Sequence, residues 1–88
     1  MNKEKREAIQ TLKIAKGQVE AIIKMIEDER YCVDISNQII AAQSLLKKSN
    51  LLILKQHMNH CVIEAIEHNK GSEKIDEIID LLSKVIGK

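Results

Sequence analysis

The chain has 88 residues, no proline and three glycines, with charged and hydrophobic shares of 31% and 44%. This composition is typical of one soluble domain, so we expect a single domain over residues 1–88. No apolar run approaches the ~18 residues that a membrane span needs, and the start of the chain lacks an apolar stretch of the signal-peptide type. We therefore expect a cytoplasmic protein, whose two cysteines are free thiols, metal ligands or redox groups rather than a structural disulfide.

A first helix is predicted over roughly residues 4 to 28 by apolar residues at three-and-four spacing. These residues are Ile9, Leu12, Ala15, Val19, Ile22, Ile23 and Ile26. Positions 1–24 also carry six basic residues against three acidic ones, an imbalance that the net charge of +1 conceals. This segregation indicates a basic face, although lysines solvated on a helix surface give the same pattern. The polar run EDER then predicts a turn.

A second apolar pattern begins near Cys32 and continues for about 36 residues without a helix breaker. We expect its members to share one face of a long helix: Ile35, Ile39, Ala42, Leu46, Ile53, His57, Cys61 and Ala65. A third, short helix follows the glycine at position 71, with a buried stripe predicted for Ile75, Ile78, Ile79, Leu82, Val85 and Ile86. The predicted fold is all-α: a three-helix protomer with a long central helix.

The lengths of the three helices do not match. At ~1.5 Å per residue the second helix spans more than about 50 Å, the first less than about 40 Å and the third about 20 Å. Such short neighbours cannot cover the apolar surface of the long helix, so we expect another chain to bury part of it. The aromatic share of 1% supports an obligate oligomer, because a monomer would bury little area per side chain.

Three side chains with metal-binding potential lie on the long helix. His57 and Cys61 are four residues apart and share a helix face, but Cys32 is 25 positions before His57, or about 38 Å along one helix. Metal donors must lie within ~2.3 Å of a common ion, so one chain cannot close this site. Two long helices packed antiparallel about a twofold axis bring Cys32 of one subunit to His57 and Cys61 of the other. The alternative is that His57 and Cys61 only fill an apolar face.

Two thiolates and one imidazole form a soft donor set that suits Cu(I), whereas Ni(II) and Co(II) usually take more nitrogen or oxygen donors. The same two sulfurs could also serve thiol or persulfide chemistry.

The segments TLKIAKGQVEAIIKMIEDERYCVDISNQIIAAQSLLKKSN and HMNHCV resemble the CsoR/RcnR/FrmR family of metal-sensing transcriptional repressors. The resemblance covers nearly the whole chain. It implies an antiparallel dimer that pairs into a tetramer (a dimer of dimers), binds operator DNA without metal and releases it when an effector binds.

The resemblance also implies a ligand set of the copper-sensing type. The copper sensors look like Cys, His, Cys, matching Cys32, His57 and Cys61, and use an outer shell matched here by Tyr31 and Glu77. The nickel and cobalt sensors place histidine at the position of Cys61 and add one near the N-terminus, where this chain has none. Formaldehyde sensors have proline where this chain has Asn2, and persulfide sensors lack the histidine of the pair.

The DNA contacts implied by the resemblance are basic side chains. Family members commonly carry arginine at the positions of Thr11, Lys13 and Lys16, and lysine neutralises phosphate without the planar fork of arginine. The candidate phosphate contacts are Arg6, Lys13, Lys16 and Lys48, with Lys5 and Lys47 as further candidates. No helix-turn-helix reading element is evident, so DNA shape is expected to contribute to specificity.

The sequence thus predicts a Cu(I)-responsive repressor that binds operator DNA as a metal-free tetramer and is released on metal binding. Two alternatives remain: a persulfide- or thiol-responsive repressor of the same fold, and a copper-binding helical oligomer that does not bind DNA. We expect no enzyme, because no acid/base pair, nucleophile triad or phosphate loop can be assembled from these residues.

Overall fold

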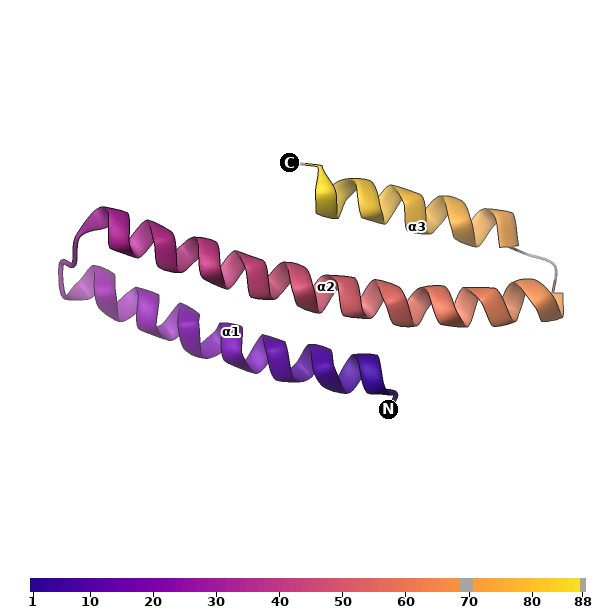
Figure 1. Ribbon diagram of the computed structural model, residues 1–88, viewed down its shortest axis with the longest axis horizontal. Helices are drawn as coiled ribbons and strands as arrows, with labels where there is room; N and C mark the ends of the chain where they lie inside the picture. The colour runs from indigo at the N-terminus through magenta and orange to yellow at the C-terminus, as the bar shows by residue number, and fades with distance from the viewer. Residues whose placement is uncertain (69–70, 88) are drawn as a thin grey trace.

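The computed structural model describes residues 1–68 and 71–87, which form three helices: α1 (Lys3–Glu27), α2 (Cys32–His68) and α3 (Gly71–Ile86). The helices α1 and α3 run antiparallel to α2 and lie on different sides of it, α1 along its N-terminal part and α3 along its C-terminal part (Figure 1). Among the described elements, α2 packs against both neighbours, and α1 and α3 do not pack against each other. The three-helix, all-α prediction is confirmed.

Hydrogen bonds cap both ends of α1. At its start, the Asn2 side chain accepts a hydrogen bond from the Lys5 backbone N–H at 2.8 Å. At its end, the turn predicted at EDER joins α1 to α2. There Glu29 adopts a left-handed φ of 55°, and its N–H donates to the Ile26 carbonyl at 3.0 Å. The Arg30 N–H donates to the Met25 carbonyl at 3.0 Å, which completes a Schellman ending. These bonds satisfy the last carbonyls of α1 and reverse the chain.

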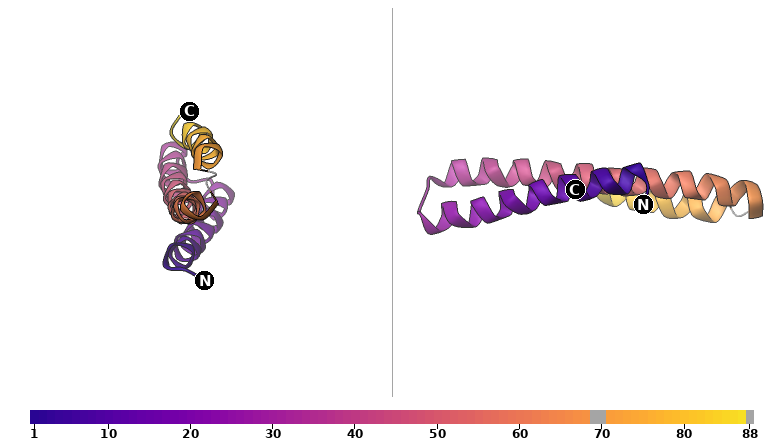
Figure 2. Two further views of the ribbon diagram at one scale, coloured as in Figure 1. Left: turned by 90° about the vertical axis from the view of Figure 1, so that its right-hand side faces the viewer. Right: turned by 90° about the horizontal axis from the view of Figure 1, so that it is seen from below.

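The molecule is elongated and thin, with extents of 56 × 28 × 12 Å (Figure 2). The contact between α1 and α2 is made largely by small side chains, which let two helices approach closely. The buried residues are Ala8, Thr11, Ala15 and Ile22 on α1, and Ala42 and Ser49 on the facing part of α2. A single layer of helices has no central core, so much of its apolar surface stays uncovered.

Two faces of α2 are buried, rather than the single face that the sequence spacing predicts. Ala42 and Ser49 are buried in its first half, whereas Leu54 and Cys61 are buried in its second half and lie about 120° around the helix from them. The single-stripe prediction is wrong because α2 is apolar on several sides, and the period alone cannot tell which side meets which neighbour.

An apolar stripe remains exposed along α2, interrupted by the polar Ser44 between Ile40 and Leu51. Helical periodicity puts its five members within about 40° of one another around the axis. They are Val33, Ile40, Leu51, Met58 and Val62, between 41% and 58% exposed. We call these residues the exposed stripe. Burial of this stripe by a second chain, and the dimer and tetramer, stay predictions.

One polar contact lies inside the α1–α2 interface. Thr11 and Ser49 are 7% and 3% exposed, and their hydroxyls form a hydrogen bond across the two helices. Each hydroxyl also contacts a carbonyl of its own helix: Thr11 that of Ala8 at 3.0 Å, and Ser49 that of Leu45 at 2.9 Å. The pair therefore fixes the register between α1 and α2 without leaving a buried hydroxyl unsatisfied.

This pair is open to a double-mutant cycle. Thr11→Val and Ser49→Ala are each expected to lower the free energy of unfolding by about 1 kcal/mol, because each removes one partner of a buried hydrogen bond. The double variant is expected to cost less than the sum of the two, since the second change no longer breaks a contact. Denaturant unfolding at one fixed protein concentration measures this, with Ser83→Ala, which removes an exposed hydroxyl on α3, as the matched control. Strict additivity of the two changes would contradict the contact.

Candidate metal centre

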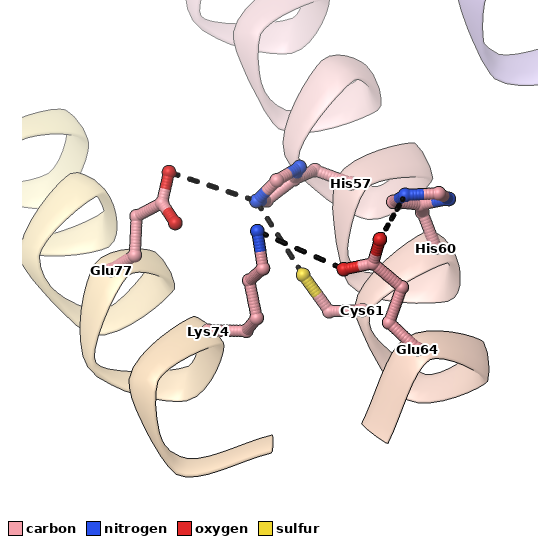
Figure 3. Close-up of polar contacts among 6 residues, drawn as sticks. All are labelled: His57, His60, Cys61, Glu64, Lys74 and Glu77. Atoms are coloured by element: carbon pink, nitrogen blue, oxygen red, sulfur yellow. Dashed lines mark hydrogen bonds and ion pairs between the residues drawn. The ribbon is translucent and has the colours of Figure 1, made fainter. Parts of the chain in front are cut away.

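A thiol and an imidazole meet on the C-terminal part of α2. His57 and Cys61 are one helical turn apart, and His57 Nε2 lies 3.5 Å from Cys61 Sγ (Figure 3). Cys61 is only 5% exposed and lies on the side of α2 that α3 covers, whereas the His57 side chain is 30% exposed. The two donors are therefore held side by side, the sulfur shielded from water and the ring at the edge.

The third helix adds a carboxylate to this pair. Glu77 Oε1 lies 3.9 Å from His57 Nε2, beyond hydrogen-bond distance but within reach of an ion pair when the ring is protonated. Figure 3 shows the Glu77 carboxylate approaching the ring from α3 and the Cys61 thiol approaching it from α2. The imidazole therefore stands between the two helices.

A second set of polar contacts lies one turn farther along α2. Glu64 Oε1 is 3.2 Å from His60 Nε2, and Glu64 Oε2 is 3.7 Å from Lys74 Nζ on α3 (Figure 3). Sequence reasoning missed Glu64 and Lys74. Their spacing carried a signal, because Glu64 follows Cys61 by three residues and Lys74 precedes Glu77 by three, so each shares a helix face with a site residue.

Cys32 and Tyr31 lie at the opposite end of α2. Cys32 is the first residue of the helix and is exposed, and Tyr31 before it is 68% exposed. Within the part of the chain that the structure describes, no three His, Cys, Asp or Glu side chains of one protomer converge as metal donors. One protomer thus holds His57 between Cys61 at 3.5 Å and Glu77 at 3.9 Å, but leaves Cys32 and Tyr31 remote, about 38 Å away along the helix.

The chemistry of the donors fits a soft metal ion. A buried thiol beside an imidazole supplies one sulfur and one nitrogen, and an exposed second thiol supplies another sulfur. Leu54 and Ile78, 5% and 6% exposed, belong to the buried apolar surface of the same α2–α3 part of the molecule. A dry surrounding of this kind favours a low-coordinate thiolate site over a hydrated hard cation.

The candidate phosphate contacts are all on the surface. Arg6 and Lys13 are seven residues apart and share the face of α1 that points away from α2, and Lys16 lies one turn beyond Lys13. Lys48 is exposed on α2. Thr11 differs, because it is buried against Ser49. The position at which the resemblance implies arginine is therefore used in this chain for helix packing.

Comparison with known proteins identifies the class of protein. The family model described as metal-sensitive transcriptional repressor matches residues 4–84. The chain therefore belongs to this family of transcriptional regulators, which confirms the resemblance seen in the sequence. No described helix is long and apolar enough to cross a membrane.

Two relatives within the family are named as copper-sensing transcriptional repressors. The chain is 42% identical to the copper-sensing transcriptional repressor CsoR of Bacillus subtilis over 83 residues, which are 94% of this chain and 82% of that protein. It is 41% identical to the CsoR of Mycobacterium ulcerans over 76 residues, which are 86% of this chain but only 65% of that relative.

Solved structures share the fold. The copper-sensing repressor CsoR with Cu(I) from Geobacillus thermodenitrificans superposes with a TM-score of 0.81 at 37% identity, covering 96% of this chain and 88% of that one. The nickel-responsive regulator InrS superposes with a TM-score of 0.77 at 22% identity, which shows the common fold alone.

Proposed function

We propose that this chain is a Cu(I)-responsive transcriptional repressor that acts through a single domain, residues 1–88. It binds operator DNA in the metal-free state and releases it when Cu(I) is bound. The observation that carries the proposal is the contact between the buried Cys61 thiol and the His57 imidazole at 3.5 Å, in a chain whose remaining cysteine is exposed. The relatives named as copper-sensing repressors support the same effector.

The exposed stripe supports a particular antiparallel dimer. If two copies of α2 pair about a twofold axis centred between residues 45 and 46, position 33 lies opposite position 58, and position 40 lies opposite position 51. All four belong to the exposed stripe, so Val33 meets Met58 and Ile40 meets Leu51. The same register brings Cys32 opposite residue 59, midway between His57 and Cys61 of the other subunit. Apolar burial and donor convergence thus favour one register.

The position of the donors around α2 agrees with this pairing. Around the axis of α2, the three donors lie within about 40° of one another, and their direction is about 90° from that of the exposed stripe. The donors are Cys32, His57 and Cys61. The proposed twofold axis is perpendicular to the plane that contains the two antiparallel helices. Rotation about this axis keeps equivalent residues on the same surface of the dimer. Two equivalent sites then form on one side of the dimer, beside α3.

In such a site Cys32 of one subunit and His57 and Cys61 of the other would hold the metal. These two thiolates and one imidazole form a donor set that suits Cu(I), and an ion held by all three would join the start of one α2 to the far part of its partner. The His57 ring contacts Glu77, which makes α3 sensitive to the ring's position, and Tyr31 precedes Cys32 at the turn from α1. Because coupling is reciprocal, bound DNA weakens metal binding by the factor by which metal weakens DNA binding.

DNA binding is proposed for the basic face formed by Arg6, Lys13 and Lys16 on α1, together with Lys48 on α2. All four side chains are exposed and can neutralise phosphate. Arg6 Nη1 also donates a hydrogen bond to the Met1 carbonyl at 3.0 Å, which leaves the other guanidinium N–H groups for phosphate. We propose that two dimers pair into a tetramer, because exposed apolar side chains also remain on α1 and α3, among them Ile14 and Ile79. A repressor shares a compartment with its operator, so this function implies the cytoplasmic location expected from the sequence.

The response to copper has a direct test. Cu(I) is titrated anaerobically into protein bound to a DNA fragment that the metal-free protein has selected from a random-sequence pool. Wild-type protein is expected to release the DNA. Cys32→Ala, His57→Ala and Cys61→Ala are expected to stay bound and to lose about 100-fold or more in copper affinity, since even outer contacts cost 10- to 100-fold.

The matched control for this titration is His60→Ala, which removes an exposed histidine next to Cys61 and is expected to respond like wild type. Wild-type protein that remains on DNA at saturating Cu(I) would rule out the function. Release by a persulfide donor that survives His57→Ala would instead indicate a thiol-responsive repressor.

The DNA contacts are tested by the salt dependence of binding to the same fragment. Replacing Lys13, Lys16, Lys48 or Arg6 by alanine is expected to weaken binding and to reduce the slope of log affinity against log salt by about 1 for each lost phosphate contact. Lys84→Ala on α3, which removes an exposed lysine paired with Asp80, serves as the control with an unchanged slope. Slopes equal to the control for all four variants would remove these residues from the interface, and a wild-type protein without DNA affinity would favour a copper-binding oligomer.

A further inference from the structure

Two polar contacts connect α2 to α3 on either side of Cys61. Along α2, His57, Cys61 and Glu64 follow at spacings of four and three residues, so they form a row on one face. Along α3, Lys74 and Glu77 form a second row. The rows run antiparallel: Glu64 Oε2 lies 3.7 Å from Lys74 Nζ, and His57 Nε2 lies 3.9 Å from Glu77 Oε1 (Figure 3).

The Glu64–Lys74 pair is better shielded from water than the ion pairs within single helices. Its two side chains are each 33% exposed. Those of three lysine–carboxylate i,i+4 pairs are between 47% and 80% exposed: Lys3–Glu7, Lys24–Asp28 and Lys84–Asp80. Opposite charges interact more strongly where water is partly excluded, so we expect this pair to contribute more than those exposed pairs.

The pair also restrains a helix that has few other attachments. In the described chain α3 packs against α2 alone, and its buried side chain there is Ile78. Apolar contacts are not directional and permit small shifts along a helix, whereas a charge pair is sensitive to the position of both groups. Because Glu77 lies three residues after Lys74 on the same face of α3, fixing Lys74 against Glu64 also fixes where Glu77 stands relative to His57.

We propose that Glu64–Lys74 is a positioning contact that holds α3 in the register in which Glu77 reaches His57, and thereby sets how strongly effector binding at His57 and Cys61 changes DNA affinity. Neither residue binds metal or DNA in this role. The second half of the proposal rests on the proposed function, and the first half concerns the metal-free protein alone.

The test uses charge reversal and charge exchange. The variants are Glu64→Lys, Lys74→Glu and the exchanged pair Glu64→Lys/Lys74→Glu. Lys84→Glu reverses an exposed charge on α3 and is the matched control, and His60→Ala removes the other partner of Glu64. If Lys74→Glu does not fold, Lys74→Gln replaces it, because this change removes the charge without adding repulsion.

Two readouts are taken from each variant. The first is the NMR shift of the His57 ring nitrogens in metal-free protein, with Glu77→Gln as the reference for a lost Glu77 contact. The second is the coupling factor, the ratio of DNA affinity without and with Cu(I). Both single reversals are expected to shift the His57 signals toward the Glu77→Gln values and to lower the coupling factor about fivefold. The exchanged pair is expected to restore both, and the two controls to keep the wild-type values.

Each contrary result has a distinct meaning. Single reversals that leave the His57 signals at wild-type values overturn the positioning contact, as does an exchanged pair that restores nothing. Shifted His57 signals with an unchanged coupling factor overturn the link to DNA affinity. Wild-type protein that shows no coupling contradicts the proposed function, while the His57 signals still decide whether Glu64 and Lys74 position Glu77.

Discussion

The length of α2 is the constraint on which the rest of this structure depends. An unbroken helix from Cys32 to His68 separates the two thiols of one chain, Cys32 and Cys61, by about 44 Å along the helix. Its neighbours are too short to cover it, so the exposed stripe stays open along its length. In the dimer that we propose, an antiparallel partner covers the exposed stripe and also supplies the missing sulfur. Assembly is then a precondition for sensing, because the proposed metal site takes donors from both subunits.

The third helix, α3, is the element that would respond to metal binding at the proposed site. Its contact with α2 combines one buried isoleucine, Ile78, with charged side chains arranged around Cys61. A helix attached in this way can shift by small amounts when a single imidazole moves, which a large apolar core would resist. The molecule is also thin, with extents of 56 × 28 × 12 Å, so most side chains lie near a surface that a partner or DNA can contact.

Much of this could be predicted from the sequence, for identifiable reasons. Helix bounds follow from apolar spacing and from the polar turn, and His57 and Cys61 follow from the rule that residues four apart share a face. Glu77 came from the family resemblance, and the structure brings it near His57. The two buried faces of α2 could not be predicted, because a helix that is apolar on several sides has no preferred face until its neighbours are placed. Glu64 and Lys74 were missed because their meeting depends on the register of α3, and Thr11 because its burial depends on the crossing of α1 with α2.

The central claim is that a complete metal site takes Cys32 from one subunit and His57 with Cys61 from the other. The most direct measurement is the Cu(I) capacity of a heterodimer made from Cys32→Ala and Cys61→Ala subunits, purified through two different tags and titrated anaerobically against a competing chelator. Each homodimer lacks one sulfur in both of its sites and is expected to bind copper weakly. The heterodimer carries one intact site and one that lacks both sulfurs, so it is expected to regain tight binding at half of the wild-type capacity. A heterodimer no better than its parents, or a Cys32→Ala homodimer with full affinity, would contradict the account.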